Sequence, residues 1–129
     1  MEKTTDLEWT AFHTGWFLDY WAIPQIKSNM TPITTVIDIP HHAAGIPGSG
    51  EVPVAFTHTT DVAKFVAASL HLEKWEHRSF IVGDKVTWNE FLRLAEQATG
   101  KPTPSRSLSE SFNAHEWAHL RRQVRRDVR

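Results

Sequence analysis

Two segments with well-marked helix boundaries constrain the fold of this chain more than any other feature of its sequence. The first follows Thr60 and Asp61, which are typical helix-capping residues, and we expect a helix over residues 62–72. The second begins after Thr87, with a glutamate three positions on in the spacing of a capping box, and ends before Gly100. Its apolar stripe comprises Trp88, Phe91, Leu92 and Ala95.

Short apolar or β-branched runs lie between these helices and are separated by Pro and Gly. The expected strands cover residues 7–13, 33–39, 43–47, 52–57 and 79–82. The segment 43–47 is expected to be a short edge segment. Pro53 also argues for an edge position, because proline cannot donate a hydrogen bond to a ladder. This alternation of strands and helices predicts an α/β fold with a small mixed sheet and three to four helices.

The remaining segments are shorter or less regular. The aromatic stretch 16–21 is expected to form one or two helical turns. Residues 101–105 are expected to be extended, and a last helix is expected from residue 109, followed by a basic tail. The tail contains Arg121, Arg122, Arg125, Arg126 and Arg129, and a solvated helix end is the plainer interpretation of it than a phosphate site.

Length and composition limit the class of protein. A chain of 129 residues fits one domain, and 40% hydrophobic residues fit a globular one. The formal net charge of −1 argues against a general nucleic-acid-binding surface, and the lack of cysteine excludes disulfides and thiolate chemistry. No run is apolar and long enough to span a membrane, and no signal peptide opens the chain, so a cytoplasmic, reducing compartment is expected.

A series of motifs resembles the NmrA-like family, which comprises atypical relatives of the short-chain dehydrogenases. The matching pieces occur in one order between residues 6 and 102, and they include residues 9–20, 46–50, 54–57, 60–66 and 81–91. They are similar to the carboxy-terminal half of such a protein. The resemblance therefore implies a truncated, Rossmann-derived domain.

The segment that binds a dinucleotide in that family has no counterpart here. Such a site needs a glycine-rich turn between a strand and a helix, where the backbone can approach the pyrophosphate. Gly45, Gly48 and Gly50 lie in a proline-containing loop with no helix directly after them. Lys27 and Lys64 do not match the context of the family's catalytic lysine. We therefore expect no cofactor, and no binding of NAD(P)H.

The candidate active site lies where the first expected strand ends, because ligands of open α/β sheets bind beyond the carboxyl ends of the strands. His13 and Asp19 are candidate acid–base residues, and His58 is a third because it also ends a strand. The residues predicted to bind a small apolar or aromatic substrate are Trp16, Phe17, Tyr20, Trp21 and Asp38. The alternative is that these aromatic residues form the core and that His13 is an ordinary strand-end residue.

Two further histidine motifs, and Asp61, have plainer explanations. His41 and His42 beside Asp38 are expected in a solvated loop, because adjacent side chains of an extended chain point in opposite directions. Asp61 is expected to cap a helix. Residues 115–119 read H-E-x-x-H, which is a zinc-protease pattern. No third zinc ligand is evident downstream, and a chain with eight histidines can contain this pattern by chance. No metal is therefore expected.

These observations lead to three hypotheses of function. The first is a cofactor-independent enzyme of secondary metabolism that isomerises, cyclises or rearranges a small substrate, and therefore needs no hydride donor. The second is a non-catalytic binding or regulatory module with the same fold. The third is the substrate-domain fragment of an NAD(P)-dependent reductase.

A homodimer is also expected. Without parallel neighbours the strand over residues 7–12 has an uncovered edge and uncovered faces, and six tryptophans exceed what a small core easily encloses. A two-fold contact with a second copy would cover the strand and the surplus tryptophans, although the last helix could instead fold back over the strand within one chain.

Overall fold

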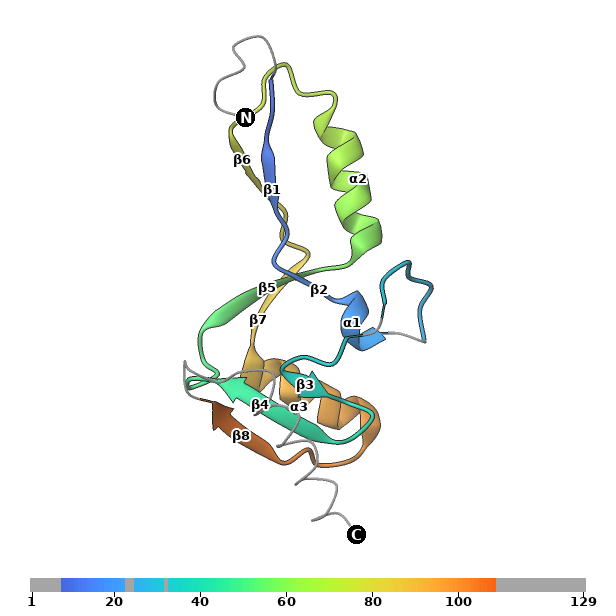
Figure 1. Cartoon of the computed structure of the whole chain (residues 1–129), viewed down its shortest axis with the longest axis vertical. Coiled ribbons are helices and arrows are strands. Elements are labelled where there is room, and N and C mark those ends of the chain that lie inside the picture. The colour runs from blue at the N-terminus through green and yellow to red at the C-terminus, as the bar shows by residue number, and fades with distance from the viewer. Residues whose placement is uncertain (1–7, 23–24, 32, 109–129) are drawn as a thin grey trace.

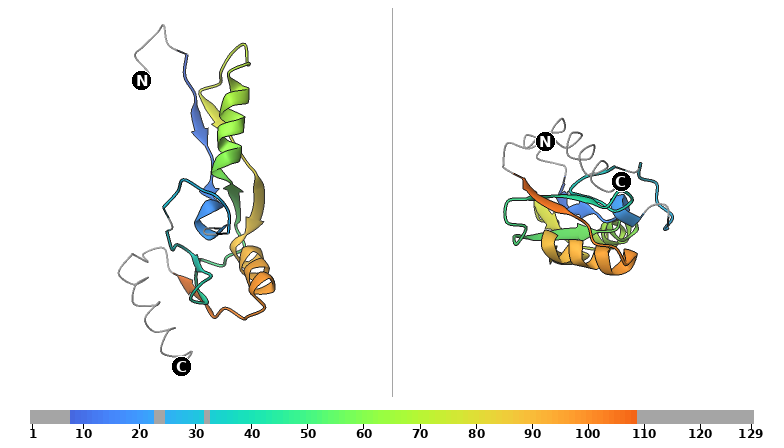
Figure 2. Two further views of the ribbon diagram at one scale, coloured as in Figure 1. Left: turned by 90° about the vertical axis from the view of Figure 1, so that its right-hand side faces the viewer. Right: turned by 90° about the horizontal axis from the view of Figure 1, so that it is seen from below.

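The computed structural model describes residues 8–22, 25–31 and 33–108. It is a mixed α/β arrangement in which the elements follow one another in the order β1–β2–α1–β3–β4–β5–α2–β6–β7–α3–β8. Figures 1 and 2 show an elongated shape with two parts. The outer region consists of β1, α2 and β6, and the core region comprises all the other elements. No helix in the described part of the chain has the length and apolar character needed to cross a membrane.

The core region is built from two three-stranded sheets. In one sheet β2 (Trp16–Phe17) is parallel to β5 (Pro53–Thr57), which is antiparallel to β7 (Asp84–Thr87). In the other, β3 (Ile37–Asp38) is antiparallel to β4 (Ala43–Pro47), which is parallel to β8 (Ser105–Leu108).

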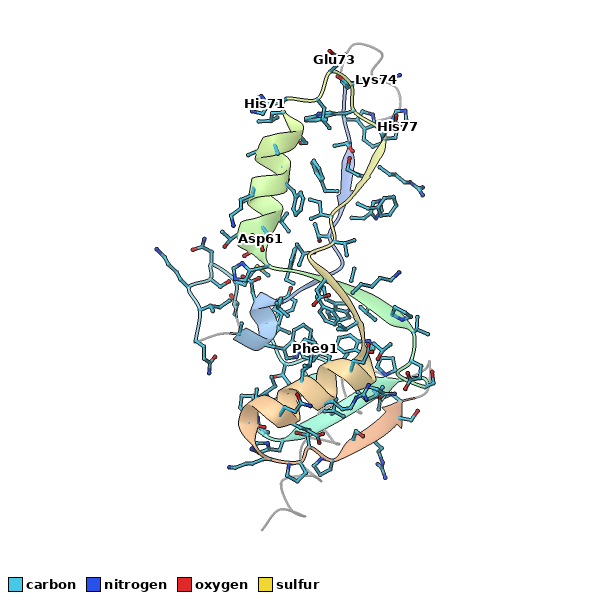
Figure 3. All side chains as sticks on the ribbon, turned by 180° about the vertical axis from the view of Figure 1, so that it is seen from behind. Asp61, His71, Glu73, Lys74, His77 and Phe91 are labelled. Carbon is cyan, nitrogen blue, oxygen red and sulfur yellow. The ribbon has the colours of Figure 1, made fainter. Side chains whose placement is uncertain are left out.

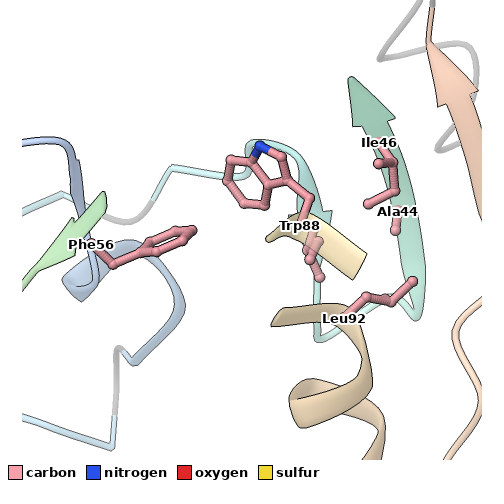
Figure 4. Close-up of a cluster of buried hydrophobic side chains, with 6 residues drawn as sticks. Ala44, Ile46, Phe56, Trp88 and Leu92 are labelled. Atoms are coloured by element: carbon pink, nitrogen blue, oxygen red, sulfur yellow. The ribbon is translucent and has the colours of Figure 1, made fainter. Parts of the chain in front are cut away.

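Helix α3 (Trp88–Thr99) supplies much of the core (Figure 4). Its buried residues Trp88, Leu92 and Ala95 repeat at helical spacing, and Phe91 packs against the same cluster. The other buried members of this cluster are Ile37, Ala44, Ile46 and Phe56. The expected capping box is confirmed: Glu90 N–H donates to the Thr87 hydroxyl, and Thr87 N–H donates to the Glu90 carboxylate. Gly100 ends the helix in the left-handed conformation, as expected.

The outer region is a two-stranded parallel sheet with one helix beside it. Strand β1 (Ala11–His13) pairs with β6 (Arg78–Phe80), so that His13 lies opposite Phe80. Helix α2 (Thr59–Ser69) connects β5 to this sheet and confirms the first expected helix, although it begins and ends three residues earlier than residues 62–72. None of its residues is buried.

Two strand positions differ from expectation. Strand β4 is not an edge segment but the middle strand of its sheet, because β8 pairs with its other side and buries Ala43, Ala44 and Ile46. Strand β5 is also central, between β2 and β7. Proline is tolerated there because Pro53 is the first residue of the strand.

The bounds of several other elements also differ. Within the β-branched run 33–39 the strand pairing with β4 covers Ile37 and Asp38, and the Val36 carbonyl oxygen accepts a further hydrogen bond from Gly45 N–H. The aromatic stretch divides into β2 and the short helix α1 (Asp19–Ala22). Residue 7 and the expected last helix from 109 lie outside the described residues.

Glycines mark the points where the chain passes between the two regions. Gly15 separates β1 from β2 at φ +66°, and a Cβ there would overlap the carbonyl oxygen of Ala55. Gly83 separates β6 from β7, and its Cβ would meet the Phe56 carbonyl oxygen at 2.9 Å. Both chain segments therefore cross β5 closely enough to require glycine.

Candidate functional site

The candidate site lies at the carboxyl ends of the parallel strands β2 and β5 (Figure 1). Leu18 N–H donates to the Thr57 carbonyl oxygen at 3.1 Å, which holds the two strand ends together. Asp19 follows β2 as the first residue of α1, and His58 follows β5 as the N-cap of α2. The topology thus brings together two of the three residues that the sequence predicted to be catalytic.

Asp19 is completely buried and its carboxylate is almost fully hydrogen-bonded. Oδ1 accepts from the Ser28 hydroxyl at 2.5 Å and from the Thr59 hydroxyl at 2.6 Å, and Oδ2 accepts from Thr59 N–H at 2.9 Å. Burial by itself raises the pKa of Asp19, but the bonds from Ser28 and Thr59 outweigh it and lower the pKa to about 2. Asp19 is therefore an ionised carboxylate over the physiological range.

The hydrogen bonds of His58 fix its tautomer. Nδ1 accepts a hydrogen bond of 3.1 Å from Thr60 N–H, so this nitrogen carries no proton while the cap is intact. A neutral ring then carries its proton on Nε2, which lies 3.7 Å from Asp19 Oδ1. The side chain is 21% exposed, and its Nε2–H is not held by a short bond to Asp19. Part of the His58 side chain is therefore open to solvent.

A neutral imidazole at a helix N-terminus can polarise a carbonyl group by donating a hydrogen bond, without being positively charged. In such a role the ring donates a hydrogen bond to the carbonyl oxygen, and the adjacent helix dipole favours the negative charge that develops there. Asp19 cannot take part directly, because no part of its side chain is exposed. Its contacts instead fix the start of α2 relative to α1.

The four aromatic residues predicted to bind substrate differ in how they are packed. Trp21 lies against Phe56, Trp88 and Phe91 with ring centroids 5.0–5.8 Å apart, and its indole N–H donates to the Ile37 carbonyl oxygen at 2.8 Å. Trp16 continues this cluster but is 36% exposed. Phe17 and Tyr20 are half-buried and meet edge to face. The core interpretation thus describes Trp21, whereas the other three retain surface that a ligand can contact.

The remaining predicted site residues lie elsewhere. His13 is exposed on β1 and its ring stacks on Phe80 at 5.0 Å, so it belongs to the outer region. Asp38 is buried on β3, where its carboxylate is 2.8 Å from Nδ1 of His41.

Sequence reasoning missed three features of this site. The N-cap of α2 is His58 and not Thr60 or Asp61, which lie in the first turn, where Asp61 pairs with Lys64 at 2.8 Å. Histidine is an uncommon cap, so no residue preference pointed to it. Ser28 and Thr59 were also not predicted, because their hydroxyls are brought to Asp19 by tertiary structure.

The described residues do not fit a dinucleotide. Gly48 and Gly50 form the turn between β4 and β5, and the element that follows them is a strand rather than a helix. Two described helices directly follow a parallel strand, and neither begins with the glycines that a pyrophosphate needs: α1 begins at Asp19, and α2 begins with His58 and two threonines. No cluster that could hold a metal occurs among the described residues, and the motif at 115–119 and the arginine tail lie outside them.

Comparison with known proteins gives a consistent class of relatives. The chain is 46% identical to Oxidoreductase BOA1 of Botryotinia fuckeliana over 115 residues, which cover 89% of this chain and 38% of the relative. It is 34% identical to Oxidoreductase swnR of Metarhizium robertsii, covering 81% of this chain and 35% of the relative. It is 29% identical to Oxidoreductase swnN of the same fungus, and the match covers 78% of this chain and 31% of the relative. No family model and no solved structure matches the chain.

The matched segment is thus a minor part of each relative. The chain spans about a third of the length of the curated proteins that it matches. It is similar to one region of fungal oxidoreductases.

Proposed function

We propose that the chain provides the substrate-binding part of an oxidoreductase of the NmrA-like type, acting on a small apolar or aromatic carbonyl compound in secondary metabolism. The observation that carries this proposal is the pairing of His58 with Asp19 at the carboxyl ends of β2 and β5. The similarity to fungal oxidoreductases over most of this chain supports the reaction class.

His58 has the central role in this proposal. Its Nε2–H donates a hydrogen bond to the carbonyl oxygen of the substrate and draws electron density away from the carbonyl carbon. The exposed part of Trp16 and the half-buried pair Phe17 and Tyr20 offer apolar surface close in sequence to Asp19. His58 is thus the catalytic residue, and the polarised carbonyl is the group on which the reaction depends.

Asp19 is a positioning residue in this scheme. Its carboxylate accepts two hydrogen bonds from Thr59, the residue next to His58, and so holds the start of α2 and the His58 ring in position. Its low pKa keeps the negative charge in place throughout the physiological range.

A cofactor-independent isomerase or cyclase is the second candidate, because a polarised carbonyl also loses an α-proton more readily. The same His58 donor would stabilise the enolate oxygen formed in that step. This candidate is favoured by the absence of a dinucleotide cradle in the described residues. It differs from the first in needing no other polypeptide segment for turnover.

A chimera tests the first candidate. The matched segment of Oxidoreductase BOA1 is replaced by this chain, and the loss of NADPH is followed with a panel of aromatic ketones. The decisive variant is His58→Asn, because asparagine is a good N-cap but lacks the imidazole donor. We expect about a 10²–10³-fold fall in kcat with unchanged thermal stability, which is the usual effect of removing one oxyanion donor.

The matched control is His58→Ala, which removes both the donor and the cap. It should lose the same activity and also about 1 kcal/mol of stability. Full turnover by His58→Asn would show that His58 is only a cap and would contradict the proposed mechanism.

The isolated chain discriminates the second candidate. Incubation with the same ketones in D₂O, without nucleotide, would place deuterium at the α-carbon if the chain alone catalyses enolisation. Exchange that disappears in His58→Asn supports the isomerase. Ketone binding without exchange, together with an inactive chimera, would leave the non-catalytic binding module.

A further inference from the structure

We infer that a hollow beside helix α2 binds an aromatic ring that carries a hydroxyl group, and that this ring is the far end of the carbonyl substrate. The inference deepens the proposed function and rests on it for the identity of the bound molecule as a substrate. The binding of the ring itself follows from the size of the hollow, its apolar walls and the charged pair that lines it.

The hollow has the size of a small-molecule site. Its volume is ≈ 450 Å³, within the range of about 300–1,000 Å³ that is usual for such sites. It lies between α2 and the β6–β7 connection, and its lining residues are Asp61, Lys64, Phe65, Ala68, Val82 and Gly83. Phe65 and Val82 are 50% and 49% exposed, so both retain apolar surface that a bound ring would remove from water.

The lining residues on α2 form one stripe along the helix. Asp61, Lys64, Phe65 and Ala68 follow one another at spacings of three or four residues, which places them on one helical face. From Asp61 to Ala68 the stripe extends over about 10 Å, because an α-helix rises by about 1.5 Å per residue. This length accommodates a flat ring system laid along the helix, with Phe65 beneath it and the charged pair at one end.

The charged pair selects a hydroxyl group on the ring. Lys64 Nζ donates to Asp61 Oδ1 at 2.8 Å. An ammonium group has three donors and a carboxylate has about four acceptor positions, so this one bond leaves both groups able to bind a ligand. A hydroxyl satisfies both, because it accepts from Lys64 and donates to Asp61. A carboxylate on the ring would be repelled by Asp61, and an ammonium group would be repelled by Lys64.

The hollow begins at the helical turn that His58 caps. Asp61 N–H donates to the His58 carbonyl oxygen at 2.9 Å. On the opposite wall, Gly83 N–H donates to the hydroxyl of Thr57, the residue before His58, at 3.2 Å. Figure 3 shows Asp61 at the end of α2 nearest the core region and His71 at the far end. One end of a molecule in the hollow therefore lies close to the turn where the proposed function places the carbonyl group.

Amide NMR spectra of the isolated chain locate the binding site, with naphthol as the probe. We expect naphthol to shift the amide signals of Ala68, Val82 and Gly83. It should bind about tenfold more tightly than its methyl ether, which has no hydroxyl proton to donate to Asp61, because a hydrogen bond to a charged group contributes at least that factor. Naphthoate and naphthylmethylamine should both bind more weakly than naphthol, since each carries a charge that one member of the pair repels.

Ala68→Phe and Ala67→Phe are matched variants. Both alanines are exposed on α2, but only Ala68 lines the hollow. Ala68→Phe places a ring in the hollow, so naphthol should bind about tenfold more weakly, whereas Ala67→Phe should leave its affinity unchanged. Asp61→Ala tests the hydroxyl separately: it should reduce the preference for naphthol over its methyl ether to less than about threefold, because the acceptor is gone.

Turnover in the BOA1 chimera tests whether the bound ring belongs to the substrate. Ala68→Phe should raise KM for a hydroxynaphthyl ketone about tenfold and leave KM for cyclohexanone unchanged, whereas Ala67→Phe should change neither. Naphthol binding by the isolated chain together with an inactive chimera would reject the proposed function alone. Ketone reduction that depends on His58, without any binding of naphthol, would reject this inference alone.

Four results would overturn the inference. Unchanged spectra at millimolar naphthol would show that the hollow binds no such ring. Equal affinities of Ala68→Phe and Ala67→Phe would place the bound ring outside the hollow. Equal binding of naphthol and its methyl ether would show that the charged pair does not recognise a hydroxyl. Shifts of the same amides with rising protein concentration, in the absence of naphthol, would assign the hollow to a contact with a second copy of this chain.

Discussion

Helices α2 and α3 have similar lengths and similar apolar content, but only α3 is packed on its apolar side. Trp88, Leu92 and Ala95 of α3 are buried against the core-region sheets, whereas α2 buries no residue and leaves Phe65 half exposed. Helical periodicity thus predicts where a helix forms but not whether another element covers it. The comparison indicates that the core region is stabilised by contacts within the described residues, whereas the outer region leaves apolar side chains exposed.

Truncation of Trp88 should have the largest effect and should confirm this contrast. Trp88→Ala removes the ring that contacts Phe56 at 5.2 Å and leaves a cavity in the core, so we expect a loss of about 3–5 kcal/mol. Phe80→Ala in the outer region should change stability by less than about 0.5 kcal/mol, because its side chain is already in water. Urea unfolding of the isolated chain measures both. Equal losses would show that the outer region is packed as tightly as the core.

Gly15, at the connection between the two regions, should rank second. Gly15→Ala forces an L-residue to φ +66° and its Cβ into the Ala55 carbonyl, so we expect a loss of about 2–4 kcal/mol. Gly48→Ala is the control, because Gly48 also has positive φ but nothing lies within 4 Å of its Cβ position. It should lose only about 1 kcal/mol. Thermal unfolding distinguishes them, and equal losses would attribute the effect to φ alone.

The Asp19 carboxylate joins α1 to the start of α2, and its effect should be smaller and dependent on pH. Its pKa falls from 3.8 to about 2 on folding, which corresponds to about 2 kcal/mol of stability. A lowered pKa stabilises the fold above the unfolded value, and the contribution is lost as the pH falls from about 4 to about 2. Asp19→Asn should therefore be less stable than the natural sequence at neutral pH and equal to it near pH 2.

Urea titrations at several pH values measure this difference. Ser28→Ala is the companion variant, because it removes one of the three hydrogen bonds to Asp19 and should show a smaller loss over the same pH range. A difference between Asp19→Asn and the natural sequence that does not depend on pH would show that the carboxylate charge contributes nothing to this connection.

The local features of this protein were determined by its sequence. Thr87 and Gly100 define the bounds of α3 because capping depends on hydrogen bonds between residues three or four positions apart. The stripe that includes Trp88 and Leu92 also identified the face that packs in the core. The lack of a glycine-rich strand–turn–helix was visible without any structure, and the described residues agree with it.

Only the tertiary structure decided which segments meet. Strand β8 reads S-R-S-L, without strand character, and yet it makes β4 a central strand because its backbone supplies the missing hydrogen bonds. His58 and Asp19 are brought together by the parallel pairing of β2 with β5, and Ser28 reaches Asp19 from a loop. Such contacts depend on backbone pairing between distant segments, which side-chain patterns within one segment do not specify. The uncovered edge of the first strand was expected from the sequence, whereas its parallel pairing with β6 was visible only in the structure.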